Sequence, residues 1–520
     1  MIKLLVLTLL VSLPTSLWAQ KGSLTRTEND VVFGAILKTG QTLKGTRYTF
    51  DNRIHKCTID SASHLAALQF RGIAKNGKYL ESKGYISSFD LNTQQILWSR
   101  KVNYQFTSVS HKPSSFLLTD IDESICIDLH SGQDIFSFRK HIYYQNDKYR
   151  VALGYGTNGM LTSAEQTLVG YDLQNTQVLW KRKLTREYTW NDAYHIDDST
   201  LMVVSSGLHT VNLRTGKGWD YDAITGSKDY TKAGIINGLG IGLGILTGTF
   251  VMATGHDVVS DLVSNVVTDS ASYYLASQDK LACLDHSGKE KWVVPLPKEM
   301  ASSSILFKKD SALILINKGS ASFGRRTVPA GKVFLASYSL QNGKSNFFIT
   351  IEQPKAQLTD ISVTADTIFL STKTDILKAS LKDGSILATK ENIVPEKEEI
   401  HTILSKRKLY TALNDSVYRN IAQTDSSFIP IYTSQGKVLL IDAQLNIKQE
   451  KTYNDFYIAY LQKDGLTFIS NKDKTIVLNK NGIAVAELKA SRSAWLQGDI
   501  LYETHDNTLN AINIKPLRKM

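Results

Sequence analysis

The stretch Ile86–Trp98 reads ISSFDLNTQQILW, and its pattern decides the fold. Apolar and small polar residues lead up to Asp90, as in a half-buried β-strand. The segment after Asp90 suits a tight turn, because Asp and Asn side chains bond back to nearby backbone N–H groups. Trp98 stands on the returning strand, eight residues after Asp90, where its ring can wedge against a neighbouring sheet. The stretch therefore predicts a β-hairpin that needs a partner sheet.

The same pattern returns along the chain. Two copies keep the aromatic residue eight positions after the Asp, at 126–136 (CIDLHSGQDIF) and 169–180 (VGYDLQNTQVLW). Two more are one residue shorter, at 212–219 (NLRTGKGW) and 285–292 (DHSGKEKW). Weaker copies centre on Ser339, Ser380, Asp442, Asn479 and Asn513. The residues that we expect to dock one repeat on the next are Trp98, Phe136, Trp180, Trp219 and Trp292.

These repeats indicate how the chain is organised. A single small sheet cannot bury such a face, so the units must stack, and copies about 35–45 residues apart fit four-stranded blades arranged radially. We therefore predict an all-β protein with a single β-propeller over residues 58–517, of eight blades within a range of seven to ten. In the N-terminal segment 20–57, we expect Val31–Leu37 to complete the last blade and close the ring. An open β-solenoid or a sandwich is the structural alternative.

The N-terminus has the features of a secretory signal peptide. Lys3 precedes the apolar run Leu4–Leu13, Pro14 interrupts it, and Ala19 precedes the expected cleavage site. The apolar run is too short for a stable membrane span. We therefore predict that residues 1–19 are removed and that the protein is exported to the periplasm or the outer membrane, or released.

The Asp-x-x-Ser/Thr-Gly-x-x-x-Trp signature resembles the tryptophan-docking motif of pyrroloquinoline-quinone (PQQ) propellers, over about residues 58–515. That family includes quinone-dependent dehydrogenases and non-catalytic scaffolds similar to the outer-membrane assembly propeller. Its dehydrogenases hold their cofactor with a disulfide between adjacent cysteines and use calcium with an Asp base. This chain has three cysteines and no adjacent pair. The resemblance therefore implies the non-catalytic branch, with no cofactor and no metal.

An apolar insertion interrupts the repeats at residues 226–268. Residues 233–255 carry no charge, and on a helix their glycines fall on one face. The opposite face would carry Ile235, Ile236, Leu239, Leu243, Leu246 and Phe250. Residues 256–266 follow with a second helical spacing, so we predict a helical hairpin. Three roles remain open for it: packing on its own propeller, docking to a membrane surface or partner protein, and crossing the membrane.

Composition and motifs narrow the function. The net charge of +11 is spread along the chain, which does not favour a nucleic-acid partner. No His-Glu-x-x-His, Cys-x-x-Cys, Gly-x-Ser-x-Gly or phosphate-binding loop occurs. We therefore predict a non-catalytic binding or scaffold propeller of the cell envelope, whose partner is another envelope protein or the membrane surface. The alternatives are an enzyme with a loop-built site at the propeller mouth and a module that binds envelope glycans.

Overall fold

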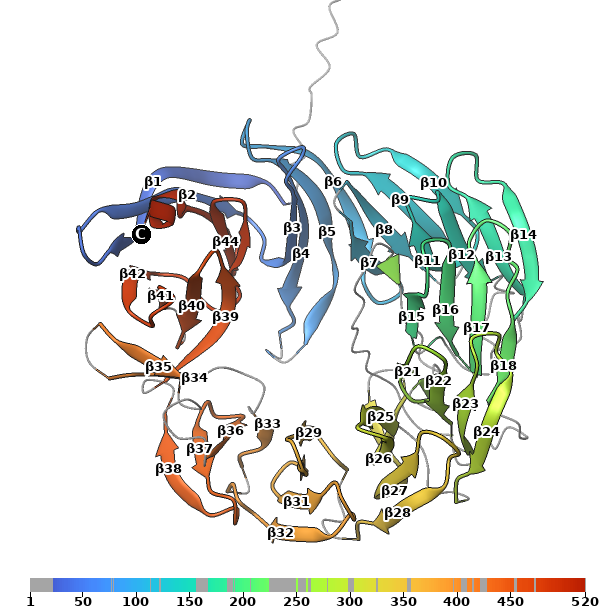
Figure 1. Ribbon diagram of the computed structural model, residues 1–520. Helices are drawn as coiled ribbons and strands as arrows, with labels where there is room; N and C mark the ends of the chain where they lie inside the picture. The colour runs from blue at the N-terminus through green and yellow to red at the C-terminus, as the bar shows by residue number, and fades with distance from the viewer. Residues whose placement is uncertain are drawn as a thin grey trace, which may run out of the picture.

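The computed structural model describes residues 22–519, except 76, 78, 113, 121–122, 156–166, 185–189, 191, 206, 224–248, 251–258, 261–262, 278, 298–303, 324–325, 353–356, 396, 404–408, 414–415, 421–427, 453–455 and 472–473. The regular secondary structure of the described residues consists of β-strands, apart from the 3-10 helix Lys515–Lys519 (η2). Antiparallel four-stranded sheets follow one another around a ring (Figure 1). The protein is a multi-blade β-propeller. Residues 1–19, the predicted signal peptide, lie outside the described residues.

The first four blades follow the chain in order. Blade 1 contains β3 (Ile54–Asp60), β4 (Leu65–Ile73), β5 (Leu80–Asp90) and β6 (Gln95–Asn103). Blade 2 contains β7 (Ser108–His111), β8 (Ser115–Thr119), β9 (Ser124–Asp128) and β10 (Asp134–Phe138). Blade 3 contains β11 (His141–Asn146), β12 (Val151–Tyr155), β13 (Thr167–Asp172) and β14 (Val178–Lys183). Blade 4 contains β15 (Asp192–His195), β16 (Thr200–Val204), β17 (Gly207–Asn212) and β18 (Asp220–Asp222).

The next four blades continue in the same sense. Blade 5 contains β21 (Val267–Thr268), β22 (Tyr273–Ala276), β23 (Lys280–Leu284) and β24 (Glu290–Pro295). Blade 6 contains β25 (Ser304–Lys309), β26 (Ala312–Phe323), β27 (Arg326–Ser339) and β28 (Ser345–Thr350). Blade 7 contains β29 (Asp360–Val363), β30 (Thr367–Ser371), β31 (Ile376–Ser380) and β32 (Ile386–Lys390). Blade 8 contains β33 (Ile400–Ile403), β36 (Ile429–Thr433), β37 (Val438–Ile441) and β38 (Ile447–Lys451).

The last two blades share one larger sheet. Blade 9 contains β39 (Tyr457–Lys463), β40 (Leu466–Ser470), β41 (Thr475–Leu478) and β42 (Ala484–Leu488). Blade 10 contains β43 (Trp495–Gln497), β44 (Ile500–His505), β45 (Thr508–Asn513) and, from the N-terminal part of the chain, β2 (Thr42–Phe50). The strand β1 (Leu24–Ile36) joins the two, since it pairs with both β2 and β42.

The core is divided among the junctions between blades. In β8, Phe116 and Leu118 pack into the cluster shared with blade 1, whereas Leu117 packs into the cluster shared with blade 3. This follows from the two-residue period of a strand, whose successive side chains point to opposite faces. A cluster of buried apolar side chains lies at every junction between successive blades, including that between blades 10 and 1. The ring is therefore closed.

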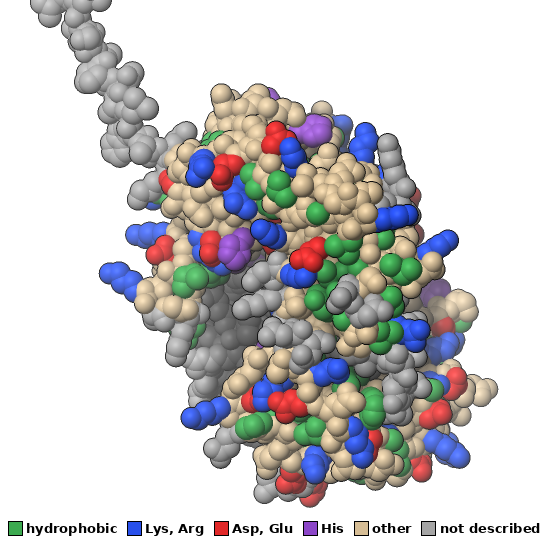
Figure 2. All heavy atoms as spheres, turned by 90° about the vertical axis from the view of Figure 1, so that its left-hand side faces the viewer, with side chains coloured by type: hydrophobic (Ala, Val, Ile, Leu, Met, Phe, Trp, Pro, Cys, Tyr) green, Lys and Arg blue, Asp and Glu red, His purple; other side chains and the backbone are tan. Residues whose placement is uncertain are grey.

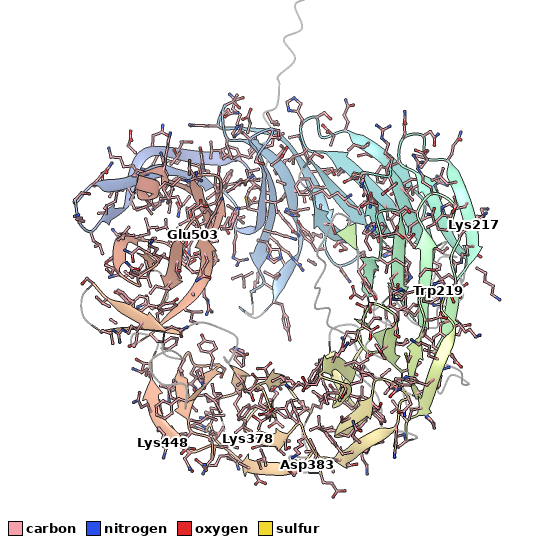
Figure 3. All side chains as sticks on the ribbon, in the orientation of Figure 1. Lys217, Trp219, Lys378, Asp383, Lys448 and Glu503 are labelled. Carbon is pink, nitrogen blue, oxygen red and sulfur yellow. The ribbon has the colours of Figure 1, made fainter. Side chains whose placement is uncertain are left out.

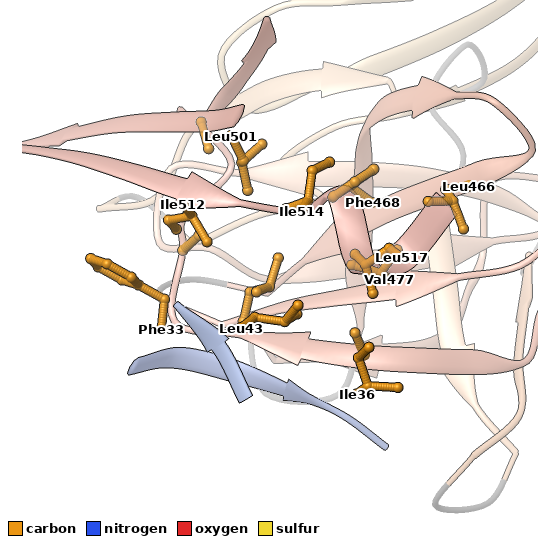
Figure 4. Packing of buried hydrophobic residues seen from close by; sticks show 14 residues of the cluster. Phe33, Ile36, Leu43, Leu466, Phe468, Val477, Leu501, Ile512, Ile514 and Leu517 are labelled. Atoms are coloured by element: carbon orange, nitrogen blue, oxygen red, sulfur yellow. The ribbon is translucent and has the colours of Figure 1, made fainter. Parts of the chain in front are cut away.

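The N-terminal strands complete the ring. β2 pairs with β45, so residues from both ends of the chain form blade 10. Phe33, Ile36 and Leu43 pack there against Leu501 and other side chains of blades 9 and 10 (Figure 4). The expectation that Val31–Leu37 completes the last blade is wrong, because β2 and not this segment is the outer strand of blade 10. Val31–Ile36 has another place. It lies in β1, against β2 and the edge of blade 9.

The blade count is ten within the described residues, so the expected number of eight is wrong, although ten lies within the predicted range. The weak copies near the C-terminus are complete blades. Their outer strands carry Ala388, Gln449 and Ala486 opposite the third strand, at the position that Trp98 holds in blade 1. Without an aromatic residue there, the sequence signature fades although the hydrogen-bonded blade persists.

Two segments depart from the blade pattern. The suspected half-repeat around residues 416–420 is a hairpin of β34 (Leu409–Ala412) and β35 (Tyr418–Asn420), which pairs with β39 of blade 9. The predicted helical hairpin is wrong where the insertion is described. Thr249–Phe250 (β19) and Val259–Ser260 (β20) are short strands, and residues 263–268 contain no helix. Short pairings with neighbouring sheets replace helical hydrogen bonds at these residues.

The antiparallel order defines two faces of the ring. In each blade, the connection from the second to the third strand and the connection to the next blade lie at one end of the strands. We call this end the front face. The turns from the first to the second strand and from the third to the fourth lie at the other end, the back face. The repeated Asp-containing turn is therefore on the back face.

Candidate functional site

The docking residues hold the ring together. Four indoles each donate their N–H to a backbone carbonyl oxygen in the turn of the following blade, and Figure 3 shows one of them, Trp219, on the outer part of the ring. The pairs are Trp98–Leu129 (2.9 Å), Trp180–Leu213 (2.9 Å), Trp219–His286 (3.1 Å) and Trp292–Leu340 (3.1 Å). A register shift beside Trp98, Trp180 and Trp292 marks a β-bulge, which re-aims the side chain.

Each indole lies against a glycine in the turn of the following blade. A Cβ added to Gly132, which has φ +72°, would lie 2.6 Å from the Trp98 ring. The glycine therefore allows both the left-handed turn and the close approach of the indole. Phe136 occupies the equivalent position in blade 2, where it is buried and packs against Phe138 with ring centroids 5.0 Å apart. All five residues therefore contribute to contacts between blades.

Two hairpins extend the front face. In blade 1 the pairing of β4 with β5 continues to Ile73 and Leu80, and in blade 6 that of β26 with β27 continues to Phe323 and Arg326. These blades are five positions apart in a ring of ten, so their hairpins stand across the ring from each other (Figure 1). The tip of the blade 1 hairpin carries Tyr79, whose exposed fraction is 69%.

A groove of about 410 Å³ lies beside the blade 1 hairpin, at the junction with blade 10. Its charged lining residues are Asp51, Arg53, Arg71, Glu81, Lys83 and Lys101. The Arg71 guanidinium lies 4.8 Å from the centre of the Tyr104 ring, a cation–π contact. Burial, followed by the charges of Arg71, Arg53 and Lys56, lowers the pKa of nearby His55. The groove therefore has a positive potential suited to acidic groups.

The two ends of the insertion lie close together, because both contact the same residue, Ser277. Ser277 donates its hydroxyl to the Ala223 carbonyl oxygen at 3.1 Å, and its backbone forms a bridge with Val263. Between these points β19 pairs with β11 of blade 3 on the inner side of the ring, and β20 pairs with β26 of blade 6 (Figure 1). These described parts contact the protein's own blades, as in the first of the three roles considered for the insertion.

Of the six predicted contact residues of the insertion, only Phe250 lies in the described ranges. The backbone of Phe250 belongs to β19, where it is opposite Tyr144. Ile235, Ile236, Leu239, Leu243 and Leu246 lie outside the described residues, so their role as contacts stays a prediction. Among the described residues, none belongs to a helix long and apolar enough to cross a membrane.

A polar cluster lies beside β19 on the inner strands of blades 3 and 4. The His195 Nδ1 is 3.1 Å from the Asp197 carbonyl oxygen, so the proton sits on Nδ1 and Nε2 accepts. The Tyr144 hydroxyl donates to Nε2 at 2.5 Å, and the Asn146 amide donates to the Tyr144 oxygen at 3.0 Å. Burial raises the pKa of Tyr144 to about 12. A tyrosine that keeps its proton is a hydrogen-bond donor and not a base.

An ion pair between a buried lysine and an exposed aspartate adjoins this cluster. The Lys112 side chain is 3% exposed, and its ammonium group lies 3.2 Å from both carboxylate oxygens of Asp147. Gln145 also donates to Asp147, at 2.7 Å. Burial lowers the pKa of Lys112, and the attraction of Asp147 opposes that shift. The pair joins the turn after β7 in blade 2 to the turn after β11 in blade 3. No group of three or more His, Cys, Asp or Glu in the described ranges is placed to hold a metal ion.

The three cysteines are free thiols. Cys126 and Cys283 hold equivalent positions on blades 2 and 5 and are buried, as expected for small apolar residues. Cys57 is partly buried at the junction between blades 10 and 1, and burial raises the pKa of its thiol. Thiols held in this protonated state are poor nucleophiles.

Sequence patterns alone missed the front-face features. The hairpin tip, the groove beside it and the Tyr144–His195 cluster come from different blades, and no motif marks them. The structure marks them by strand length, since blades 1 and 6 have longer second and third strands than their neighbours.

No family model and no curated protein matches the chain. Among solved structures, BamB from Moraxella catarrhalis is similar at 12% identity, covering 73% of this chain and 96% of its own, with a TM-score of 0.31. A eukaryotic initiation factor is similar at 10% identity, with coverages of 68% and 81% and a TM-score of 0.36. The dihydro-heme d1 dehydrogenase NirN matches at 11% identity, with coverages of 71% and 70% and a TM-score of 0.30. These values say nothing about function.

Proposed function

We propose that the protein is an exported, non-catalytic scaffold of the cell envelope that binds a partner protein on the front face of its propeller. The observation that supports this most directly is the pair of extended hairpins on blades 1 and 6. Both project from the same face of a closed ring, and closure makes the ring a rigid support. Extended connections on a rigid scaffold are where binding residues concentrate.

The chemistry of this face suits an acidic partner segment. The groove beside the blade 1 hairpin has four basic and two acidic side chains. Tyr79 and Ile73, both exposed at the end of the hairpin, add apolar area next to those charges. An aromatic anchor beside a charged rim is a common composition for a protein interface. By contrast, basic and acidic side chains are interspersed on the side of the ring that carries β1, β2 and β35 (Figure 2).

The insertion is proposed to belong to the same docking face. It enters from the front-face connection between blades 4 and 5, and its described strands pair with blades 3 and 6. It therefore links the inner side of the ring to the blade 6 hairpin. In this proposal its apolar residues enlarge the partner surface, or contact the membrane surface nearby.

The docking face can be tested by photo-crosslinking in intact cells. A photoreactive residue replaces Tyr79 on the front face and, as the control, Leu413, which is 50% exposed in a back-face connection. We expect one discrete adduct from position 79 and none from position 413. Equal adducts from both positions, or none from position 79, would contradict front-face docking.

The insertion can be removed without cutting into the ring. Replacing residues 224–262 with a short Gly-Ser linker is feasible because Ala223 and Val263 both contact Ser277. The linker must not extend to residue 268, since the Asn265 side chain bonds to both the backbone N–H and the carbonyl oxygen of Leu306. We expect a folded protein that loses the adduct from position 79 or leaves the membrane fraction. An unchanged adduct and fractionation would exclude the insertion from docking.

The non-catalytic assignment has its own test. Purified protein is mixed with PQQ and calcium, and the absorbance and dye reduction are recorded. We expect neither to change. A cofactor spectrum with substrate-dependent dye reduction would replace the scaffold proposal with an enzyme.

A further inference from the structure

A second groove lies between blades 2 and 3, away from the front-face hairpins. Its volume is about 420 Å³, within the roughly 300–1,000 Å³ of small-molecule sites. β10 and the connection after it form one wall, and β13, the following turn and β14 form the other. The lining residues are Ser137, Phe138, Arg139, Lys140, Thr167, Val169, Tyr171, Thr176, Val178 and Lys181.

The groove exists because this junction lacks the usual docking pair. At four other junctions a Trp indole lies against a turn glycine, as Trp98 does against Gly132. Here the aromatic residue is Phe136, and the turn residue is Thr176 with φ +61°. A β-branched side chain at that point would occupy the space of an indole, since even a Cβ added to Gly132 would lie 2.6 Å from the Trp98 ring. The smaller ring and the side chain of Thr176 therefore leave the outer part of the junction unfilled.

Three basic side chains line this space without a counter-ion. Arg139 and Lys140 come from the connection after β10, and Lys181 from β14. Within the described ranges, none of the three makes an ion pair. One carboxylate touches the rim, where Ser137 donates to Glu123 at 2.7 Å. The lining is therefore net positive.

The rest of the lining suits a sugar-sized molecule. Phe138 and Tyr171 form a buried aromatic floor, with ring centroids 4.6 Å apart. Ser137, Thr167 and Thr176 supply hydroxyl groups around it. Apolar rings can face the C–H groups of a pyranose, hydroxyl groups can bond to its oxygens, and Arg and Lys can pair with a phosphate or carboxylate.

We propose that the groove between blades 2 and 3 binds an anionic monosaccharide unit, a sugar that carries a phosphate or a carboxylate. This site is independent of the front-face docking proposed above, because it shares no lining residue with the front-face groove. The phosphate and carboxylate forms share one recognition chemistry. They are distinguished by the ligands used in the test.

Calorimetric titration of the full exported protein tests the ligand class. The ligands are glucose 1-phosphate and glucuronate, with glucose and inorganic phosphate as controls. We expect at least one of the two charged sugars to bind about tenfold more tightly than either control. Absence of binding, equal binding of glucose, or equal binding of inorganic phosphate would each overturn the proposal.

Variants locate the binding to the groove. Replacing Arg139 and Lys181 together with Ala should weaken binding about tenfold or more, because charge-assisted hydrogen bonds are lost. Lys217→Ala removes one exposed charge on blade 4 outside the groove and should leave affinity unchanged (Figure 3). Glu123→Gln removes the rim carboxylate and should strengthen binding. Equal effects of the groove and control variants would overturn the assignment.

A filling variant tests why the groove exists. The double substitution Phe136→Trp and Thr176→Gly builds the Trp–Gly docking pair that four other junctions contain. It should abolish binding while raising the melting temperature. Unchanged binding in a folded double variant would show that the missing indole does not create the site. If that variant does not fold, the Glu123→Gln result still decides whether the charged sugar lies at this rim.

Discussion

The Trp219 indole donates its N–H to the His286 carbonyl oxygen at 3.1 Å, across 67 positions of the chain. The other three indole contacts of this kind span 31 to 48 positions. The longer separation contains the insertion, and the docking geometry is the same. Blades 4 and 5 are thus neighbours in the ring despite the residues inserted between them.

This contact predicts the effect of Trp219→Phe. The change removes the hydrogen bond and part of the buried ring, so we expect a loss of about 1–2 kcal/mol in the free energy of unfolding. Chemical denaturation measures it. Trp98→Phe is the matched control at an uninterrupted junction and should cost a similar amount. If Trp98→Phe lowers the free energy of unfolding by this amount and Trp219→Phe does not lower it, blades 4 and 5 are not docked.

Arg182 joins blades 3 and 4 through four polar contacts. Its guanidinium donates to the carbonyl oxygens of Thr210, Gly216 and Trp219 and to the Asp220 carboxylate. The side chain is 14% exposed, so Arg182→Met removes a largely buried donor from the Thr210 and Gly216 carbonyl oxygens. We expect a destabilisation of about 2–4 kcal/mol.

The control for Arg182 is a solvent-exposed ion pair on the protein surface. Lys148 and Asp198 are 3.0 Å apart, with side chains 61% and 85% exposed. Lys148→Met should change the free energy of unfolding by less than about 0.5 kcal/mol. Similar losses in both variants would contradict the structural role given to Arg182.

His111 predicts a pH dependence of stability. Burial, then the charges of Lys56 and His55, lowers its pKa from 6.5 to about 3. Between these values the unfolded chain binds a proton that the folded chain does not, so stability falls as the pH falls from about 6.5 toward 3. His111→Gln should flatten this dependence by up to about 1.4 kcal/mol per pH unit. Denaturation at pH 7, 6, 5 and 4 measures it, and parallel curves for the two proteins would contradict the assignment.

Gly45 tests ring closure directly. It lies on β2 opposite Ile512 of β45, and a Cβ there would be 2.1 Å from the Ala511 carbonyl oxygen. Gly45→Ala should therefore force the closing strands apart and lower the melting temperature by several degrees. Gly40→Ala is a control without steric conflict, although Gly40 has φ +69° and a small cost is expected there. A Gly45 variant as stable as the Gly40 variant would mean that β2 does not pair as described.

Much of the fold could be predicted from short-range sequence features. Asp90 and Trp98 lie within one hairpin, and the bond from the Asn92 N–H to the Asp90 carboxylate, 2.8 Å long, is made within the turn. Such turn chemistry needs only near neighbours, so five copies of it predict a repeated blade. Blades 7, 8 and 9 lack this signature because Ala388, Gln449 and Ala486 stand in place of the aromatic residue.

The candidate sites could not be predicted in the same way. The groove between blades 2 and 3 depends on the absence of an indole from one blade and of a glycine from the next. The front face depends on the lengths of hairpins that are far apart in the chain. In the insertion, the spacing of apolar residues indicated helices, whereas pairing with β11 and β26 gives short strands at the described residues.

The sequence by itself determined the unit of this protein: an antiparallel sheet with an Asp-containing turn and an aromatic side chain that needs the next sheet. Hydrogen bonding and hydrophobic period within a few residues are enough to specify that unit. Only the tertiary structure decided that ten units, as counted over the described residues, close into a ring, that β2 completes the blade begun near the C-terminus, and which side chains share a groove. Those outcomes depend on pairing between β2 and β45, hundreds of residues apart, and on how each blade fits the next.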